Sequence, residues 1–192
     1  MTLVLMFLII DKPKGWTSFD VVAKLRKYFN EKKVGHLGTL DPLATGVLVI
    51  AVGRQSTKQI PEYIKADKEY EVVMELGKVS PSYDLEFEPE PTGFDVSILD
   101  DEKILDVMES FWGKSMQKPP IFSAKKVAGR KAYKSARQGE TVELKQVEVF
   151  MEGREIRIEK PFVKFKVKVS SGTYIRSLVN DIGEKLGCGA VL

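Results

Sequence analysis

The stretch that decides the fold reads GHLGTLDPLATGVLVIAV over residues 35–52. Its second part, from Gly46 to Val52, is an apolar run without a polar break, which predicts a strand buried on both faces. Its first part is a loop in which three glycines within twelve residues allow positive φ angles and a close backbone approach to a ligand. Pro42 keeps Asp41 extended and outside any helix. The sequence therefore places one carboxylate on a loop that a rigid strand anchors.

Two interpretations of Asp41 are open at this point. An aspartate before a proline commonly opens a turn, because its carboxylate accepts hydrogen bonds from nearby backbone amides. A single carboxylate on a loop held by a rigid element is also a sound arrangement for catalysis. Local chemistry alone favours the turn.

The segments around this stretch alternate between helical and extended patterns. A capping signal at Thr17-Ser18 precedes a helical face, and the last helix runs from about Tyr174 to Leu186, with Gly187 as its cap. A third helix is expected from about Asp100 to Trp112. Strands are expected over residues 3–10, where the first strand is buried, and over residues 70–76 and 164–169, where apolar and charged residues alternate. Mixed helices and strands without regular βαβ alternation predict an α+β fold.

Composition narrows the functional classes. The 192 residues are 43% hydrophobic, which supports a globular protein with a real core. One cysteine, Cys188, excludes an internal disulfide and fits a reducing compartment. One histidine and one cysteine make a zinc or iron site improbable, so no metal is expected. The apolar run at residues 3–10 is too short to span a bilayer. We therefore expect a soluble, cytoplasmic, monomeric protein.

Charge is unevenly distributed although the net charge is only +3. Residues 118–137 contain seven lysines or arginines and no acid, and this basic block interleaves Phe122 and Tyr133. Such a pattern is typical of segments that bind phosphates and bases together, and equally of a solvated surface. Residues 84–102 contain eight acids and no base, so this acidic block is expected to face away from RNA.

Five blocks of the chain, in order, resemble the TruB family of pseudouridine synthases. They are DKPKGWTS at residues 11–18, the loop at residues 35–48, KEY at residues 68–70, PPIFSAKK at residues 119–126 and GTYIRS at residues 172–177. The resemblance implies a pseudouridine synthase fold, with a curved, mainly antiparallel mixed sheet flanked by helices and a central RNA-binding cleft. It implies isomerisation of the T-loop uridine of tRNA, at position 55, after the base is flipped out. No redox step occurs, so no cofactor is expected.

The resemblance also implies roles for particular residues. Asp41 is the expected nucleophile or base, Arg176 the cation that keeps it ionised, and Tyr70 the aromatic side chain that stacks on the uracil. Residues expected to contact the RNA are His36, Tyr174, Lys58, Lys125, Lys126, Arg130 and Lys131. Judged without the resemblance, Arg176 could be a surface residue, both tyrosines could belong to the core and His36 could be solvated.

The resemblance further implies one catalytic domain over residues 1–192. Residues 78–145 are then an RNA-gripping excursion, and the PUA-type region that follows in relatives is absent. Stand-alone members of the resembled family usually have a Thr-Asp-Thr motif after the strand that ends near Leu76. This chain has the sequence SPSYD there, at residues 80–84. Two alternative functions are a non-catalytic binding or chaperone module for the tRNA elbow and the catalytic subunit of a guide-RNA-directed complex.

Overall fold

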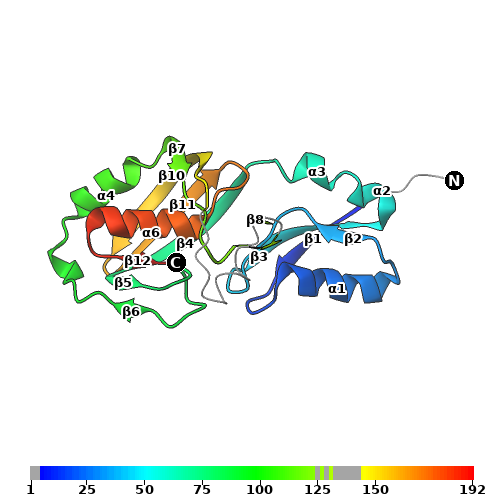
Figure 1. Cartoon of the computed structure of the whole chain (residues 1–192), viewed down its shortest axis with the longest axis horizontal. Coiled ribbons are helices and arrows are strands. Elements are labelled where there is room, and N and C mark those ends of the chain that lie inside the picture. Colours follow the sequence, from blue (N-terminus) through cyan, green and yellow to red (C-terminus); the bar gives the residue numbers. More distant parts are fainter. Residues whose placement is uncertain (1–4, 124–125, 128–129, 132–143) are drawn as a thin grey trace. The chain divides into compact units, whose positions relative to one another are not determined.

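The computed structural model describes residues 5–123, 126–127, 130–131 and 144–192. The chain divides into two compact units, Met1–Ala66 and Asp67–Leu192. Figure 1 shows the elements of each unit in sequence colours. Both units combine antiparallel strands with helices, so the fold is α+β as predicted. None of the helices in the described part of the chain is both long and apolar enough to cross a bilayer.

The first unit is a three-stranded antiparallel sheet with one long helix on it. The strands are β1 (Met6–Lys12), β2 (Val34–His36) and β3 (Gly46–Val52), in the order β1-β3-β2. Helix α1 (Ser18–Phe29) packs its apolar face on this sheet, and two short helices follow β3, namely α2 (Gly53–Thr57) and α3 (Ile60–Tyr63). The buried residues of this core are Val21, Val22, Val34, Leu48, Ile50 and Val52.

Helix α1 begins where its capping signal predicts. The Thr17 side chain accepts a hydrogen bond from the backbone N–H of Asp20, and the Asp20 carboxylate accepts one from the backbone N–H of Thr17. This reciprocal box satisfies two amides that have no partner inside the helix. The helix ends at Asn30 in the left-handed conformation, with φ of 48°.

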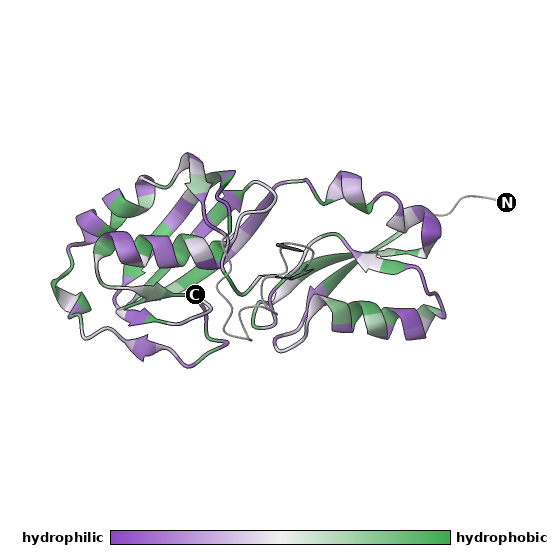
Figure 2. Ribbon diagram, viewed as in Figure 1, coloured by the Kyte–Doolittle hydropathy of each residue, from purple (hydrophilic) through white to green (hydrophobic). Residues whose placement is uncertain are grey.

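The predictions that β3 is buried on both faces and that β1 is a buried strand are wrong. Leu48, Ile50 and Val52 are buried, but Val47 is 70% exposed and Ile9 on the paired strand is 76% exposed. Figure 2 shows both strands as largely hydrophobic over their length. Helix α1 packs against the face that carries Leu48 and Ile50. The opposite face is exposed at Val47 and buried at Ala51, so it is covered over only part of the strand.

The second unit is built on a five-stranded antiparallel sheet in the order β12-β4-β11-β10-β7. These strands are β4 (Lys68–Leu76), β7 (Gly113–Gln117), β10 (Val147–Glu159), β11 (Phe162–Val169) and β12 (Ala190–Val191). Helices α4 (Asp101–Glu109) and α6 (Ile175–Leu186) cover one face, as Figure 1 shows. The strands predicted near residues 70–76 and 164–169 are confirmed, and Gly187 caps α6 with φ of 79°.

The other face of this sheet is charged, and its charges are paired across strands. Lys164 contacts Glu159, Lys166 contacts Glu155 and Glu71, and Lys168 contacts Asp67, with N···O distances between 2.7 and 3.8 Å. The alternation of β11 therefore places its lysines among carboxylates on a solvated face.

Short elements complete the second unit. They are β5 (Lys78–Val79), β6 (Glu90–Pro91), the 3-10 turn η1 (Val96–Ile98), β8 (Lys126–Val127) and β9 (Arg130–Lys131). Helix α4 is shorter than predicted, because Ser110 ends it and Gly113, with φ of 89°, begins β7.

Candidate active site

Asp41 lies in the loop that connects β2 to β3 in the first unit. The loop stays on the sheet at both ends, since Leu37 N–H donates to the Val49 carbonyl at 2.9 Å and Gly46 enters β3 with φ of 108°. The Asp41 carbonyl accepts a hydrogen bond from Ala44 N–H at 3.1 Å, which makes a tight turn after the aspartate. Asp41 itself is half-buried.

Lys12 holds the residues next to Asp41 in place. Its side chain has no exposed surface, and its Nζ donates to the carbonyls of Pro13 at 3.1 Å, Trp16 at 2.7 Å and Pro42 at 3.2 Å. Burial lowers the pKa of Lys12, and the nearby Asp41 carboxylate opposes that effect. One buried ammonium group thus ties the turn after β1 to the loop that carries the aspartate.

Ser18 fixes the chain on the other side of Asp41. Its Oγ accepts from Leu40 N–H at 2.9 Å and donates to the Leu40 carbonyl at 3.1 Å. Gly15 N–H also donates to the Pro42 carbonyl at 2.8 Å. The residues before and after Asp41 are therefore both held by the segment 12–18, which is how a loop can present one carboxylate with little freedom.

Two further predicted site residues lie in the first unit. His36 ends β2 and is half-buried, and burial lowers its pKa while a backbone hydrogen bond with Gly38 opposes the shift. His36 is therefore neutral at pH 7. Within the described residues its Nδ1 is buried without a hydrogen-bond partner. Lys58 follows α2 and is exposed.

Arg176 is a buried residue of the second unit, in the first turn of α6. Only 5% of it is exposed, so the surface interpretation is excluded. Its guanidinium donates to the carbonyls of Ser82 and Phe122, both at 3.1 Å, and its Nε lies 3.5 Å from Asp84 Oδ2. These contacts place the loop at residues 80–84, the first part of the basic block and the start of α6 around one positive charge.

Asp84 belongs to the acidic block but is not a solvated residue of it, since it is 6% exposed. Its Oδ1 accepts hydrogen bonds from the Ser82 hydroxyl and from Glu86 N–H. Asp84 is therefore not part of a solvated acidic surface but lies beside Arg176, a predicted site residue. The signal available in the sequence was the SPSYD string at residues 80–84, which departs from the pattern that the resemblance implies.

The two predicted tyrosines occupy different positions in the second unit. Tyr70 is half-buried in β4, opposite Val167, and packs on the main core. Tyr174 is the residue before α6, and the buried Gln117 side chain forms hydrogen bonds to both of its backbone groups. Gln117 Nε2 donates to the Tyr174 carbonyl at 3.0 Å, and Gln117 Oε1 accepts from Tyr174 N–H at 2.8 Å. The sequence gives no local signal for Gln117, because its hydrogen-bond partner is 57 residues away.

The basic block is only partly described. Lys125 lies outside the described residues. The antiparallel pair β8–β9 contains Lys126, Arg130 and Lys131, with Lys126 opposite Lys131. The structure describes only the backbone of these three residues. Among the described residues, no three histidine, cysteine, aspartate or glutamate side chains are grouped so that they could hold a metal ion.

Comparisons with known proteins agree on one family. The family model described as TruB family pseudouridylate synthase (N terminal domain) matches residues 26–175. The chain is 47% identical to tRNA pseudouridine synthase B of Chloroherpeton thalassium, covering 97% of this chain and 79% of the relative. It is 45% identical to the enzyme of the same name from Protochlamydia amoebophila, covering 96% and 70%.

A solved structure shows the same fold. The chain matches a chain of a Cbf5-Nop10-Gar1 complex with a TM-score of 0.68 and 34% identity. The match covers 96% of this chain but only 45% of that chain, so the present chain spans less than half of the solved protein.

Proposed function

Because this chain belongs to the TruB family of pseudouridylate synthases, we propose that it converts the uridine of the tRNA T-loop to pseudouridine. The reaction breaks the bond between N1 and C1′, turns the uracil and joins C5 to C1′, while C5 loses a proton and N1 gains one. Nothing is oxidised or reduced, so the side chains of the chain suffice for the chemistry.

We assign the catalytic roles to Asp41, Arg176 and Tyr70. One carboxylate is enough for either route to the isomer, by attack of its oxygen on C1′ or by removal of a ribose proton. Arg176 is the cation proposed for the reaction centre, and Tyr70 the aromatic face for the detached base. Stacking tolerates rotation of the base, because it depends little on orientation in the ring plane. His36, Tyr174, Lys58 and the basic block are proposed RNA contacts.

The observation that carries this proposal is the clamp on the Asp41 loop. Lys12 and Ser18 hold the residues on both sides of the aspartate through hydrogen bonds to backbone groups. An aspartate that merely opens a turn needs no buried lysine beneath it. A carboxylate that must meet one atom of a flipped nucleotide does need a fixed backbone, because small displacements slow a positioned reaction strongly.

The two alternatives are less well supported. A binding module has no use for a clamped carboxylate and a buried arginine. A catalytic subunit of a guide-RNA-directed complex shares the fold, but the stand-alone tRNA pseudouridine synthase B relatives are more similar, at 47% against 34% identity. We also propose that the protein acts as a monomer in the cytoplasm, where its buried free Cys188 would remain reduced.

The test is chemical mapping of pseudouridine in an unmodified tRNA transcript after incubation with the protein. We expect one modified position, in the T-loop, and no modification by Asp41→Asn, because an amide can neither attack C1′ nor remove a proton. The matched control is Asp11→Asn, an exposed aspartate of β1, which should modify the RNA as the wild type does. Turnover by Asp41→Asn well above background would refute the assignment of Asp41.

A further inference from the structure

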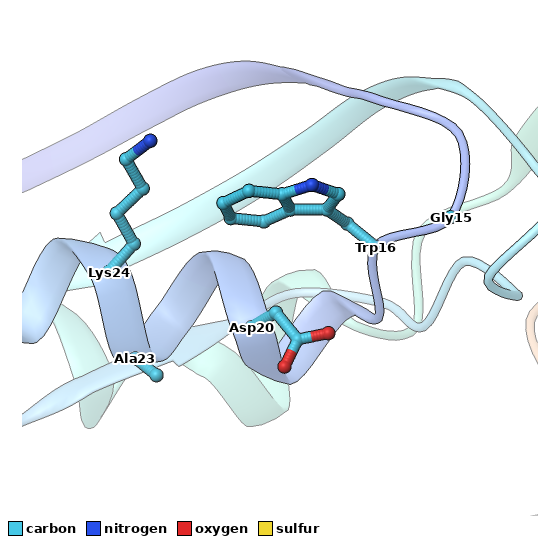
Figure 3. A pocket seen from close by; sticks show the side chains of 5 residues that line it. All are labelled: Gly15, Trp16, Asp20, Ala23 and Lys24. Atoms are coloured by element: carbon cyan, nitrogen blue, oxygen red, sulfur yellow. The ribbon is translucent and has the colours of Figure 1, made fainter.

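A hollow of about 420 Å³ lies on the outside of the first unit, and the proposed catalytic residues do not line it. Its lining residues are Gly15, Trp16, Asp20, Ala23 and Lys24. Figure 3 shows the indole of Trp16 lying across α1, with the ammonium end of Lys24 on one side of the hollow and Asp20 on the other. Ala23 has a small side chain, so the hollow between Lys24 and Asp20 is not filled.

The lining combines three kinds of binding group. Trp16 offers an aromatic surface, and Lys24 Nζ lies 5.0 Å from the centre of its ring. Asp20 is fixed by hydrogen bonds from Thr17, which lower its pKa and keep it ionised at neutral pH. Those bonds use only Oδ2, and within the described residues Oδ1 has no hydrogen bond. An aromatic face, a cation and a carboxylate oxygen match the base, phosphate and amino groups of a nucleotide.

The hollow is coupled to the loop that carries Asp41. Lys12 Nζ donates to the carbonyls of both Trp16 and Pro42, and Gly15 N–H donates to the Pro42 carbonyl. The turn that forms one wall of the hollow is therefore hydrogen-bonded to the residue directly after Asp41. A group bound against Trp16 therefore contacts the segment that holds the Asp41 loop.

We propose that this hollow is a subsite for an unpaired nucleotide that flanks the target uridine. The proposal rests on the proposed function, since the occupant belongs to the RNA that is modified. Flipping one base out of a folded loop leaves its neighbours with less stacking. Trp16 replaces the lost stacking for one of them, Lys24 contacts its phosphate, and Asp20 accepts from its amino or imino group.

The direct readout is fluorescence, because the chain has two tryptophans and only Trp16 lines the hollow. Trp112 belongs to the second unit and packs on Phe165. In the variant Trp112→Phe, titration with a T-arm stem–loop RNA should quench the remaining Trp16 emission. In Trp16→Phe, the same titration should leave the Trp112 emission unchanged. RNAs with one abasic nucleotide, placed at each flanking position in turn, should abolish the quenching at a single position.

Binding variants give an independent measurement. Trp16→Ala should weaken RNA binding by about 5- to 150-fold, the range for loss of one stacked base. Lys24→Ala, which removes an exposed side chain and leaves the packing intact, should weaken it by a smaller factor and reduce the salt dependence. The matched control is Tyr28→Ala, which removes a 78% exposed aromatic residue from the same helix and should bind as the wild type does.

The outcomes separate this subsite from the proposed function. Quenching that depends on one flanking base supports the subsite even if no uridine is isomerised, in which case only the proposed function falls. Normal isomerisation without quenching, with Trp16→Ala and Lys24→Ala binding within twofold of the wild type, overturns the subsite and leaves the function standing. Failure of the wild type to bind the RNA at all overturns both.

Discussion

Lys12 is a charged side chain without exposed surface, and backbone carbonyls are its hydrogen-bond partners. Burying a charge is unfavourable unless hydrogen bonds and an opposite charge compensate. Here three carbonyls supply the hydrogen bonds, and the Asp41 carboxylate supplies the opposite charge that raises the pKa of Lys12 against the effect of burial. Lys12 is therefore a positioning residue for the loop that carries Asp41.

We expect Lys12→Met to lower both stability and turnover. Three carbonyls lose the donor that Lys12 provides, and of these the Pro42 carbonyl keeps a second donor, Gly15 N–H. The loss should reduce the free energy of unfolding by about 1–3 kcal/mol. Loss of the clamp should slow single-turnover isomerisation by about 100-fold, because the carboxylate is no longer held in place. Urea unfolding and single-turnover assays measure the two effects. Lys14→Met, an exposed lysine of the same turn, is the control.

The result for Lys12→Met that would contradict this role is a wild-type rate in a variant that remains folded. The clamp on Asp41 would then be structural only. If Lys12→Met unfolds at the assay temperature, Ser18→Ala is tested in its place. This substitution removes the hydrogen bonds to Leu40 and leaves Lys12 in place.

The sequence indicates Asp41 and Arg176 as candidate site residues but not the residues that hold them. A carboxylate in a glycine-rich loop is visible in the sequence itself, whereas the bond between Lys12 and Pro42 joins positions 30 residues apart and depends on the sheet. The same holds for Arg176, whose Ser82 partner is 94 residues away. Partners of buried charges are set by tertiary structure, so a single sequence shows only that such a partner must exist.

At the scale of elements, α6 is the best-predicted part of the chain. Its apolar stripe and its glycine cap are local signals, and the structure confirms both. The wrong prediction that β3 is buried on both faces arises because burial is set by tertiary packing and not by a local signal. A continuous apolar run is compatible with one or two covered faces, and only the packing of α1 on one side decides between them.

Arg176 joins α6 to two loops, so its structural and catalytic roles need to be separated. We expect Arg176→Met to lower stability by about 3–5 kcal/mol, because Asp84 is left as a buried charge without its partner. Adding Asp84→Asn should restore part of that stability. It should not restore turnover, because the cation proposed for the reaction centre is still missing.

Unfolding in urea and single-turnover assays on the two single variants and the double variant measure this cycle. Binding to tRNA should change much less than turnover throughout. If the double variant regains both stability and turnover, Arg176 acts only by holding the loop at residues 80–84.

The acidic residues of α6 predict a pH-dependent stability. Burial, aided by Glu184 and opposed by a hydrogen bond from Asn180, raises the pKa of Asp181 from 3.8 to about 6. The folded state therefore binds the proton more tightly than the unfolded state, and the contribution of Asp181 to stability falls as the pH rises from about 4 to about 6. Asp181→Asn removes this loss.

We expect Asp181→Asn to match the wild type near pH 4 and to be more stable at pH 7. The gain should be on the order of 1 kcal/mol, since a shift of about two pKa units is reduced by partial exposure to solvent. The measurement is the difference in unfolding free energy between variant and wild type across this pH range. Asp106→Asn, an exposed aspartate on α4, is the control. A difference that does not vary with pH would show that Asp181 is ordinarily solvated.

At the scale of the whole molecule, the charges of the chain separate into two groups with different environments. Each lysine of β11 has a carboxylate within 4 Å, from β10, from β4 or from the residue before β4. The basic block at residues 118–137 has no acid within it. The sequence shows both groups of positive charges, but only the strand register shows that the first is already neutralised.

We therefore expect RNA binding to depend on the basic block and not on the sheet. Replacing Lys125, Lys126, Arg130 and Lys131 with alanine should weaken binding to tRNA and flatten its dependence on salt. Each phosphate contact contributes about 0.7–0.9 to the magnitude of the slope of log K against log salt. If each of the four side chains contacts one phosphate, the magnitude of this slope should fall by about 3.

The matched control replaces Lys164, Lys166 and Lys168 with alanine, which removes three positive charges whose carboxylate partners remain. If the protein attracts RNA only through its overall charge, both sets of substitutions should weaken binding similarly. If the basic block contacts phosphates locally, only the first set should change the slope. An unchanged slope in the first set would show that the basic block is solvated, and the RNA-binding surface would then have to be sought among Lys58, Lys24 and the residues around the Asp41 loop.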